Sequence, residues 1–112
     1  MKKVNTNNFK KTLSKFSTGI TVVCVKNNNS IYGKTVNSFN SLSLNPPMVL
    51  FSLGNYSSSI KKFSKTKFLS INILSSKQKK LSDNFALTEP NLEDIKFIEG
   101  KNKTVVIPNC IA

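Results

Sequence analysis

The apolar residues of this 112-residue chain fall in short runs that are separated by polar turns. Ile20 to Lys26 is rich in β-branched side chains, which favours a strand. Asn27 to Asn29 predicts a turn, because asparagine tolerates a left-handed backbone. Ser30 to Val36 returns as a second strand, and Gly33 within it indicates a bulge or a close backbone approach. The pattern therefore predicts a β-hairpin over residues 20–36.

Three other segments have apolar residues at helical spacing. An amphipathic helix is predicted over residues 6–17, and it ends near Gly19. A short helix opens at the serines of 57–59 and places Ile60 and Phe63 on its inner face. A second short helix spans Lys77 to Phe85. We expect these helices to flank a sheet.

The middle of the chain is harder to assign. Thr35 to Asn45 is interpreted as a polar connection. Pro46 and Pro47 then impose an extended entry to Met48–Leu53, which is interpreted as a buried strand. Further strands are predicted at Phe68–Leu74 and Thr104–Ile107, with a short element at 95–98 and an exposed loop over 87–96. The prediction is a single, mainly β domain over residues 1–112.

The net charge of +12 comes from lysine, since the chain contains no arginine. Direct reading of DNA bases relies on the forked guanidinium of arginine, which lysine does not reproduce. We interpret the abundance of lysine and asparagine as a coding bias. A nucleic-acid surface and an attraction to anionic small molecules are the alternatives, and no sequence-specific binding to nucleic acid is expected.

Several kinds of chemistry are excluded by the residues present. The chain has no histidine and two distant cysteines, Cys24 and Cys110, so neither imidazole catalysis nor a metal-ligand cluster is expected. Cys24 lies in the apolar run 20–25 and is interpreted as a small buried hydrophobe. The four glycines match neither a P-loop nor a dinucleotide-binding turn. If the protein is an enzyme, a cofactor must therefore supply its chemistry.

No apolar run approaches the ~20 residues of a membrane span, and the first residues lack the apolar centre of a signal peptide. The expected location is the cytoplasm, and no association with a membrane is expected.

Two polar clusters are candidate binding segments. The serines at 57–59 precede a predicted helix, where free N–H groups favour phosphate, and Lys61, Lys62 and Lys65 add positive charge. Simple helix capping is the alternative. Thr35 to Ser38 lies where a strand ends and would direct backbone N–H groups at a planar ring, whereas its alternative is an ordinary polar turn.

The order and spacing of six short segments resemble one known family. The segments are Phe16–Val23, Thr35–Phe39, Ser41–Pro47, Ser57–Ser59, Phe68–Leu74 and Leu81–Ala86. They are similar to the flavin reductase family, which has a split β-barrel flavin-binding fold and includes the reductase components of two-component flavin monooxygenases. The resemblance covers Phe9 to Ala86 continuously and resumes around Val106 to Ala112.

The resemblance implies an antiparallel Greek-key split β-barrel with flanking helices. It implies a homodimer with FMN or FAD near the subunit interface, reduced by NADH or NADPH and passed to a partner monooxygenase. Thr35, Val36, Asn37 and Ser38 would contact the isoalloxazine, partly through backbone. Ser52 and Leu53 would flank the flavin, and Ser57, Ser58 and Ser59 would lie beside the ribityl phosphate.

The chain departs from the family at its end. Family domains continue through further strands that carry a Gly-Asp-His-like motif linked to nicotinamide binding. This chain has no histidine and finishes before such a motif, so we expect an incomplete barrel and assign no catalytic residue. Two functions stay open: an NAD(P)H:flavin oxidoreductase, or a flavin-binding redox carrier or structural module without turnover.

Overall fold

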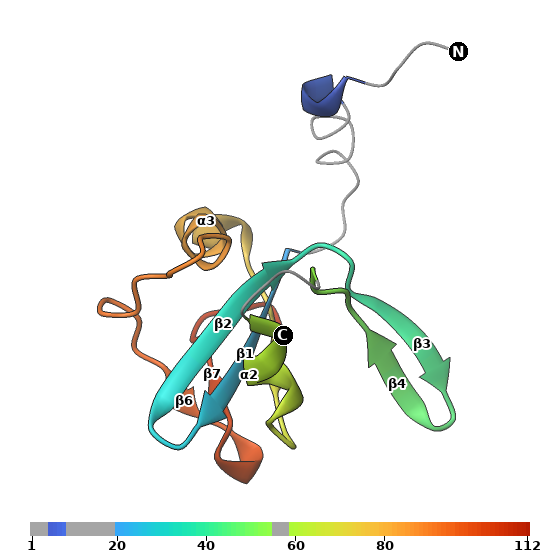
Figure 1. Cartoon of the computed structure of the whole chain (residues 1–112), viewed down its shortest axis with the longest axis vertical. Coiled ribbons are helices and arrows are strands. Elements are labelled where there is room, and N and C mark those ends of the chain that lie inside the picture. The colour runs from blue at the N-terminus through green and yellow to red at the C-terminus, as the bar shows by residue number, and fades with distance from the viewer. Residues whose placement is uncertain (1–4, 9–19, 55–58) are drawn as a thin grey trace.

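The computed structural model describes residues 5–8, 20–54 and 59–112. Residues 6–8 are helical, whereas the rest of the predicted 6–17 helix lies outside the described residues. The other elements in chain order are β1 (Thr21–Asn27), β2 (Ser30–Val36), β3 (Asn40–Leu44), β4 (Pro47–Leu50), α2 (Ser59–Ser64), β5 (Ser70–Ile73), η1 (Ser76–Gln78), α3 (Lys79–Phe85), β6 (Ile98–Glu99), η2 (Lys101–Lys103) and β7 (Val105–Val106). The described part of the chain is mainly β with flanking helices, as predicted (Figure 1).

Strand β1 is the centre of the main sheet, whose order is β2-β1-β5 with antiparallel pairing throughout. The predicted hairpin over 20–36 is confirmed, and its pairing runs without a bulge from Thr21 opposite Val36 to Asn27 opposite Ser30. On the far side of β5, Ile73 exchanges two backbone hydrogen bonds of 2.8 Å with Ile111 and Ala112. The C-terminal residues thus extend the sheet beyond β5.

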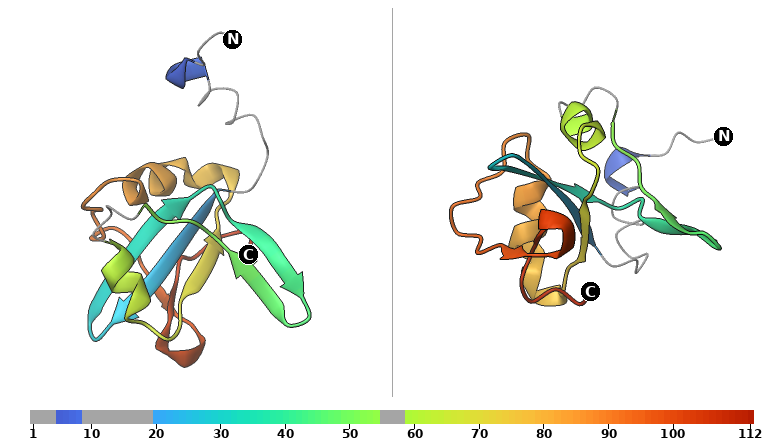
Figure 2. Two further views of the ribbon diagram at one scale, coloured as in Figure 1. Left: turned by 45° about the vertical axis from the view of Figure 1, so that its right-hand side comes forward. Right: turned by 90° about the horizontal axis from the view of Figure 1, so that it is seen from below.

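Side chains of β1 alternate between the two faces of the sheet, and each face is covered by a helix (Figure 2). On one face lies what we call the α3 cluster, made of Val22, Cys24, Leu74, Phe85, Val105 and Ile107. On the other lies the α2 cluster, made of Val23, Val25, Val36 and Phe63. This two-sided burial explains why β1 is a continuous apolar run rather than an alternating one.

Gly33 allows α3 to approach the hairpin closely. A Cβ atom at this position would lie 2.5 Å from Cε1 of Phe85. The sequence left a bulge and a close approach open, and the regular pairing of β2 leaves the close approach as the reason for glycine.

A buried amide joins β5 to its neighbours. The Asn72 side chain donates to the carbonyl of Val22 at 3.0 Å and accepts from the N–H of Ile107 at 2.9 Å. Beside it, the Ser70 hydroxyl donates to the carbonyl of Val105. These bonds satisfy buried backbone groups where β7 crosses the sheet without pairing with it.

Strands β3 and β4 form a separate antiparallel hairpin that projects from the body (Figures 1 and 2). We call this hairpin, residues 40–50, the arm. Two predictions are wrong here. The polar connection predicted over Thr35–Asn45 contains the strand β3, and the strand predicted as buried over Met48–Leu53 is the exposed strand β4, which ends at Leu50. Pro46 lies in the turn between the two strands.

The sequence did not predict the arm for two reasons. Strand β3 alternates serine with leucine, so it resembles a polar connection, and strand β4 is apolar, so it resembles a buried strand although its side chains are exposed. Its exposed apolar side chains are Leu42, Leu44, Met48, Val49 and Leu50.

The remaining elements agree with the predictions apart from their boundaries. The predicted helix Lys77–Phe85 is η1 followed by α3, and the strands predicted at 68–74 and 104–107 shorten to β5 and β7. The predicted element at 95–98 overlaps β6 only at Ile98, where β6 pairs with β7. The loop over 87–96 is largely exposed, and its Asn91 makes two hydrogen bonds with the side chain of Asn84.

Candidate functional site

The first candidate segment, Thr35–Ser38, lies where β2 ends. Val36 is buried in the α2 cluster, and the hydroxyl of Thr35 donates to the carbonyl of Ser82 on α3 at 2.7 Å. Asn37 is exposed and Ser38 is half-buried. The Thr35 and Val36 side chains are therefore engaged with the body, so a ligand at this edge would contact their backbone and the side chains of Asn37 and Ser38.

A hydrogen bond across the base of the arm brings the first two candidate segments together. The backbone N–H of Ser52 donates to Oγ of Ser38 at 2.7 Å. Because Ser38 accepts this bond, its hydroxyl hydrogen remains able to donate elsewhere. The neighbouring Leu53 packs against the α2 cluster and adds an apolar surface below the two polar residues.

The third candidate segment is placed by helix α2. This helix begins at Ser59, as predicted, and its Phe63 is buried in the α2 cluster. The helix is held on the hairpin at two points: Asn27 donates to the carbonyl of Lys62 at 3.2 Å, and Nζ of Lys62 lies 4.0 Å from the centre of the Tyr32 ring. Ser57, Ser58 and the Ser59 side chain lie outside the described residues, so the prediction for these hydroxyls stays a prediction.

Together these segments place hydrogen-bonding groups and apolar side chains in one region. The polar groups come from Asn37, Ser38 and Ser52, and the apolar surface comes from the half-buried Phe39, Phe51 and Leu53, which pack against the α2 cluster. A flat ring system with carbonyl and ring-nitrogen edges, such as an isoalloxazine, matches such a surface chemically.

Sequence reasoning missed three contributors to this region. Phe39 and Phe51 pack against the α2 cluster, and the ring of Phe51 lies 6.5 Å from that of Phe63 in an edge-on arrangement. Ser82 holds Thr35 from 47 positions away. The two phenylalanines directly follow or precede predicted site residues, which was a usable signal, whereas no local pattern pairs Thr35 with Ser82.

Neither cysteine is an activated thiol. Burial is the main cause that raises the pKa of Cys24 to about 12, with the nearby Cys110 thiol as a second cause and a Ser70 hydrogen bond acting against both. Burial also raises the pKa of Cys110, while a hydrogen bond with Gln78 lowers it. The prediction that Cys24 is a buried small hydrophobe is confirmed.

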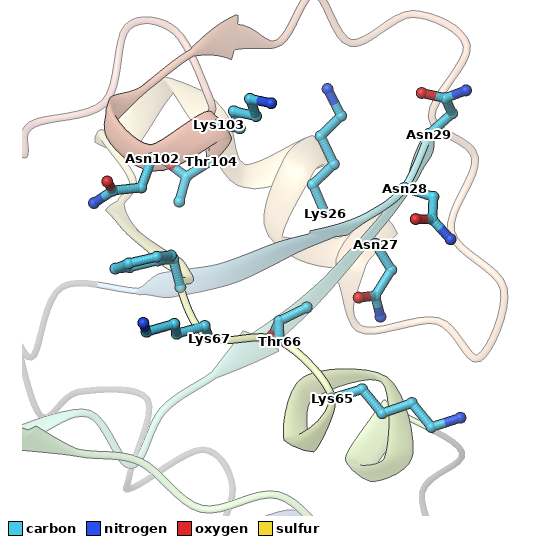
Figure 3. A pocket seen from close by; sticks show the side chains of 11 residues that line it. Lys26, Asn27, Asn28, Asn29, Lys65, Thr66, Lys67, Asn102, Lys103 and Thr104 are labelled. Atoms are coloured by element: carbon cyan, nitrogen blue, oxygen red, sulfur yellow. The ribbon is translucent and has the colours of Figure 1, made fainter.

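Other depressions of the surface lie away from the candidate segments. Two open depressions of about 740 Å³ each are lined by residues other than the candidate segments. The first lies at the turn between β1 and β2 and is lined almost entirely by lysine, asparagine and threonine (Figure 3). We place the candidate flavin site at the base of the arm nevertheless, because the segments that resemble flavin-binding ones lie there beside side chains packed on the α2 cluster.

Two absences can be stated for the part of the chain that the structure describes. None of its helices is long and apolar enough to cross a membrane. It also contains no group of three or more histidine, cysteine, aspartate or glutamate residues that would hold a metal ion.

Comparison with known proteins decides the family. Residues 13–112 match the model of the flavin reductase like domain. The chain belongs to this family. The family predicted from the six sequence segments is therefore confirmed, and with it the mainly β fold of flavin reductases.

Individual relatives agree. The chain is 36% identical over 108 residues to FMN reductase (NADH) SmoA of Agrobacterium fabrum, an alignment that covers 96% of this chain and 62% of SmoA. It is 36% identical over 83 residues to HsaB, the reductase subunit of a flavin-dependent monooxygenase of Mycobacterium tuberculosis, which covers 74% of this chain and 44% of HsaB. The solved structure of flavin reductase PheA2 superposes with a TM-score of 0.77 at 37% identity and covers 96% of this chain and 69% of PheA2. The chain thus spans about half to two thirds of the length of these relatives.

Proposed function

We propose that the protein is an NAD(P)H:flavin oxidoreductase that transfers hydride from a nicotinamide cofactor to FMN or FAD. The names of its relatives support this, since they include an NADH-dependent FMN reductase, an NADH-dependent flavin reductase and an NADH:FMN oxidoreductase. Residues 1–112 act in this proposal as one flavin reductase-like domain.

The proposed flavin site consists of Thr35, Val36, Asn37, Ser38, Ser52, Leu53, Ser57, Ser58 and Ser59. The observation that carries it is the hydrogen bond from Ser52 to Ser38, because it joins two segments that were assigned separately to the flavin. The α2 helix, which begins at the third segment, packs on the same apolar cluster.

Each part of the site has a physical task. The backbone of Thr35 and Val36, together with the Asn37 amide and the Ser38 hydroxyl, orients the polar edge of the ring system. Leu53, Phe39 and Phe51, which pack on the α2 cluster, exclude water from its apolar side, which strengthens these hydrogen bonds. The hydroxyls of 57–59, with Lys61, hold the phosphate. Lys62 adds positive charge near the same helix, although its ammonium lies on the Tyr32 ring. A bound flavin supplies the capacity to accept hydride, and the protein contributes position and electrostatics.

We also propose a homodimer with the flavin close to the subunit interface. The arm supports this, because its five exposed apolar side chains are unusual for a surface that stays in water. The arm starts two residues after Ser38 and ends two residues before Ser52, so a second copy seated on it would lie next to the flavin site.

Two further assignments follow from the relatives and from the thiols. A flavin-dependent monooxygenase is the proposed recipient of reduced flavin, since several relatives are named as reductase components of such enzymes.

The cytoplasm is the proposed location, because Cys24 and Cys110 are both free thiols, a state that a reducing compartment maintains.

The redox carrier or non-catalytic module remains the second candidate, favoured by the lack of any histidine in the chain. Two measurements on the purified protein separate the candidates. Quenching of flavin fluorescence on titration reports binding, and NADH oxidation with added FMN reports turnover. Binding with turnover supports the reductase, binding alone supports the carrier, and the absence of binding contradicts both.

The proposed phosphate contact has its own test. Replacing Ser58 and Ser59 by alanine is expected to weaken FMN more than riboflavin, because each hydrogen bond to a charged group contributes ~1.5–3 kcal/mol. The control replaces Ser76 and Thr88, two exposed hydroxyl residues outside the proposed site, by alanine. Equal loss of FMN and riboflavin would place the phosphate elsewhere.

A further inference from the structure

The depression at the turn between β1 and β2 is a candidate site that the proposed function does not use. We call it the lysine basin; it is lined by Lys26, Asn27, Asn28, Asn29, Lys65, Thr66, Lys67, Phe68, Asn102, Lys103 and Thr104 (Figure 3). Three separate segments form it: the hairpin turn, the connection from α2 to β5, and η2 with the residue after it. Its volume is about 740 Å³.

The charge of the basin has one sign. Four of its lining residues are lysines, and none of them is an aspartate or glutamate. Within the described residues, the five acids of the chain lie on other elements, from Asp83 on α3 to Glu99 on β6. Four lysines around one depression without a carboxylate make its electrostatic potential positive, which favours a bound anion.

The basin also offers neutral donors. Asn28, Asn29 and Asn102 are among its lining residues, and each side-chain amide carries two N–H groups. Asn28 and Asn102 have positive φ angles of 53° and 57°, and Lys103 has a φ of 60°. A left-handed backbone conformation is uncommon for lysine. Here it belongs to the tight turn that contains Asn102 and Lys103.

The arrangement of the lysines indicates the size of the anion. In Figure 3, Lys26 and Lys103 lie on one side of the basin, while Lys65 and Lys67 lie across it and extend in different directions. Charges distributed around a rim match an anion with several charged groups better than a single phosphate. Phe68, an exposed aromatic side chain of the lining, adds a surface on which a base would stack.

The basin is separate from the proposed flavin site. The pairing of β1 with β2 places Asn27 opposite Ser30 at the basin and Thr21 opposite Val36 at the flavin end. Six residues of extended strand separate these ends, which corresponds to about 20 Å. A ligand in the basin would therefore not compete directly with flavin.

We propose that the lysine basin binds an anion that carries several phosphate groups, either an inorganic polyphosphate or a nucleoside triphosphate. The four ammonium groups neutralise the phosphates, and the asparagine amides donate to their oxygens. Because lysine recognises phosphate as a point charge, affinity should fall steeply as salt rises.

Isothermal titration of the purified protein with tripolyphosphate, ATP and orthophosphate tests the proposal. We expect tripolyphosphate to bind at least about tenfold more tightly than orthophosphate, since more ion pairs form. Equal affinity for ATP and tripolyphosphate would assign recognition to the phosphates, and tighter binding of ATP would add a contact of its base with Phe68; both results support the proposal.

Two matched variants decide whether the basin itself is responsible. The test variant changes Lys26, Lys65, Lys67 and Lys103 to glutamine. The control variant changes four exposed lysines elsewhere, Lys77, Lys79, Lys80 and Lys96, to glutamine and so removes the same charge. We expect the test variant to lose tripolyphosphate binding by more than tenfold and the control to change by less than twofold.

Equal losses in the two variants, or equal affinity of the unaltered protein for orthophosphate and tripolyphosphate, would overturn the proposal in favour of diffuse charge. Riboflavin titration of the test variant provides a folding check that is independent of phosphate. If the variant has a native circular dichroism spectrum and still binds tripolyphosphate with unchanged affinity, the basin is not the site.

Discussion

Strand β1 and the arm are both apolar stretches of the chain, but they differ in burial. Val22, Val23 and Cys24 of β1 are 0% exposed, whereas Leu44 of the arm is 93% exposed. The first stretch has a helix on each face and a strand on each side, whereas among the described residues the second pairs with its own partner strand alone. The apolar character of the two stretches therefore does not determine their burial. The elements that pack against each stretch determine it. Perturbing the two stretches separately tests how far this difference extends.

The largest difference is expected in the reactivity of thiols. Cys24 on β1 should react with a water-soluble thiol reagent at least ~10³-fold more slowly than Cys110, because its exposure requires opening of a core worth about 5 kcal/mol or more. Burial also disfavours its thiolate, the reactive form. Mass spectrometry of the labelled peptides over time measures both rates, and rates within tenfold of each other would show that β1 is not two-sidedly buried.

The raised pKa of Cys24 also makes stability depend on pH. Above pH 9 the unfolded thiol ionises, while the folded thiol keeps its proton until the pH reaches about 12. The unfolded state then binds fewer protons, so stability falls as pH rises, by up to about 1.4 kcal/mol per pH unit. Urea unfolding of Cys24→Ala should show a shallower decline in stability than that of the unaltered protein between pH 9 and 11.

The next largest effect is expected at the helix that covers β1. Phe85→Ala removes the largest fully buried side chain among the described residues and should cost about 3–5 kcal/mol. Leu44→Ala in the arm deletes a side chain that is almost fully exposed and should change stability by less than about 0.5 kcal/mol. Urea unfolding measures both, and similar losses would mean that the arm is packed in solution.

Asn72 tests the polar part of the body. Asn72→Ala removes the acceptor of the Ile107 N–H and a donor to the Val22 carbonyl. We expect the free energy of unfolding to fall by about 2–4 kcal/mol, because both backbone groups are buried. Asn40 is the control, since its side chain accepts only from the neighbouring N–H of Ser41 on an exposed strand. An Asn72→Ala variant as stable as Asn40→Ala would show that water replaces the lost bonds.

Gly33 tests the close contact between α3 and the hairpin. Gly33→Ala should cost about 1–3 kcal/mol, because the added methyl group overlaps the ring of Phe85. Adding Phe85→Leu should recover part of that loss through direct coupling of the two sites. Strictly additive losses in the double variant would place the cost in the backbone of β2 rather than at the ring.

The smallest effect on the fold is expected in the arm. Leu44→Asp with Met48→Asp should change the stability of the single chain by less than about 0.5 kcal/mol, since both side chains are exposed. The same variant should weaken the proposed homodimer by placing charges in an apolar contact. Sedimentation equilibrium checks the association, and a dimer that persists unchanged would assign its interface to another surface.

The sequence by itself determined the family, the hairpin over 20–36, the helices near 60 and 80, and the burial of Cys24. These features depend on local patterns: β-branched runs, asparagine turns, apolar residues at helical spacing and motifs in a fixed order. Two of the segments proposed for the flavin, 35–38 and 57–59, were suggested by polar residues at a strand end and a helix start, whereas Ser52 and Leu53 came from the family resemblance.

Only the tertiary structure decided which apolar stretch is buried and which polar residues meet. Met48 to Leu50 looks like core in the sequence but lies in the arm, since burial depends on whether another element packs against a strand. Three features join residues that are 14 to 77 positions apart in the chain. They are the hydrogen bond from Ser52 to Ser38, the hydrogen bond from Thr35 to Ser82, and the four lysines that line the basin at the hairpin turn. Such pairs have no local signature, because chain distance does not constrain them until the sheet and its helices have packed.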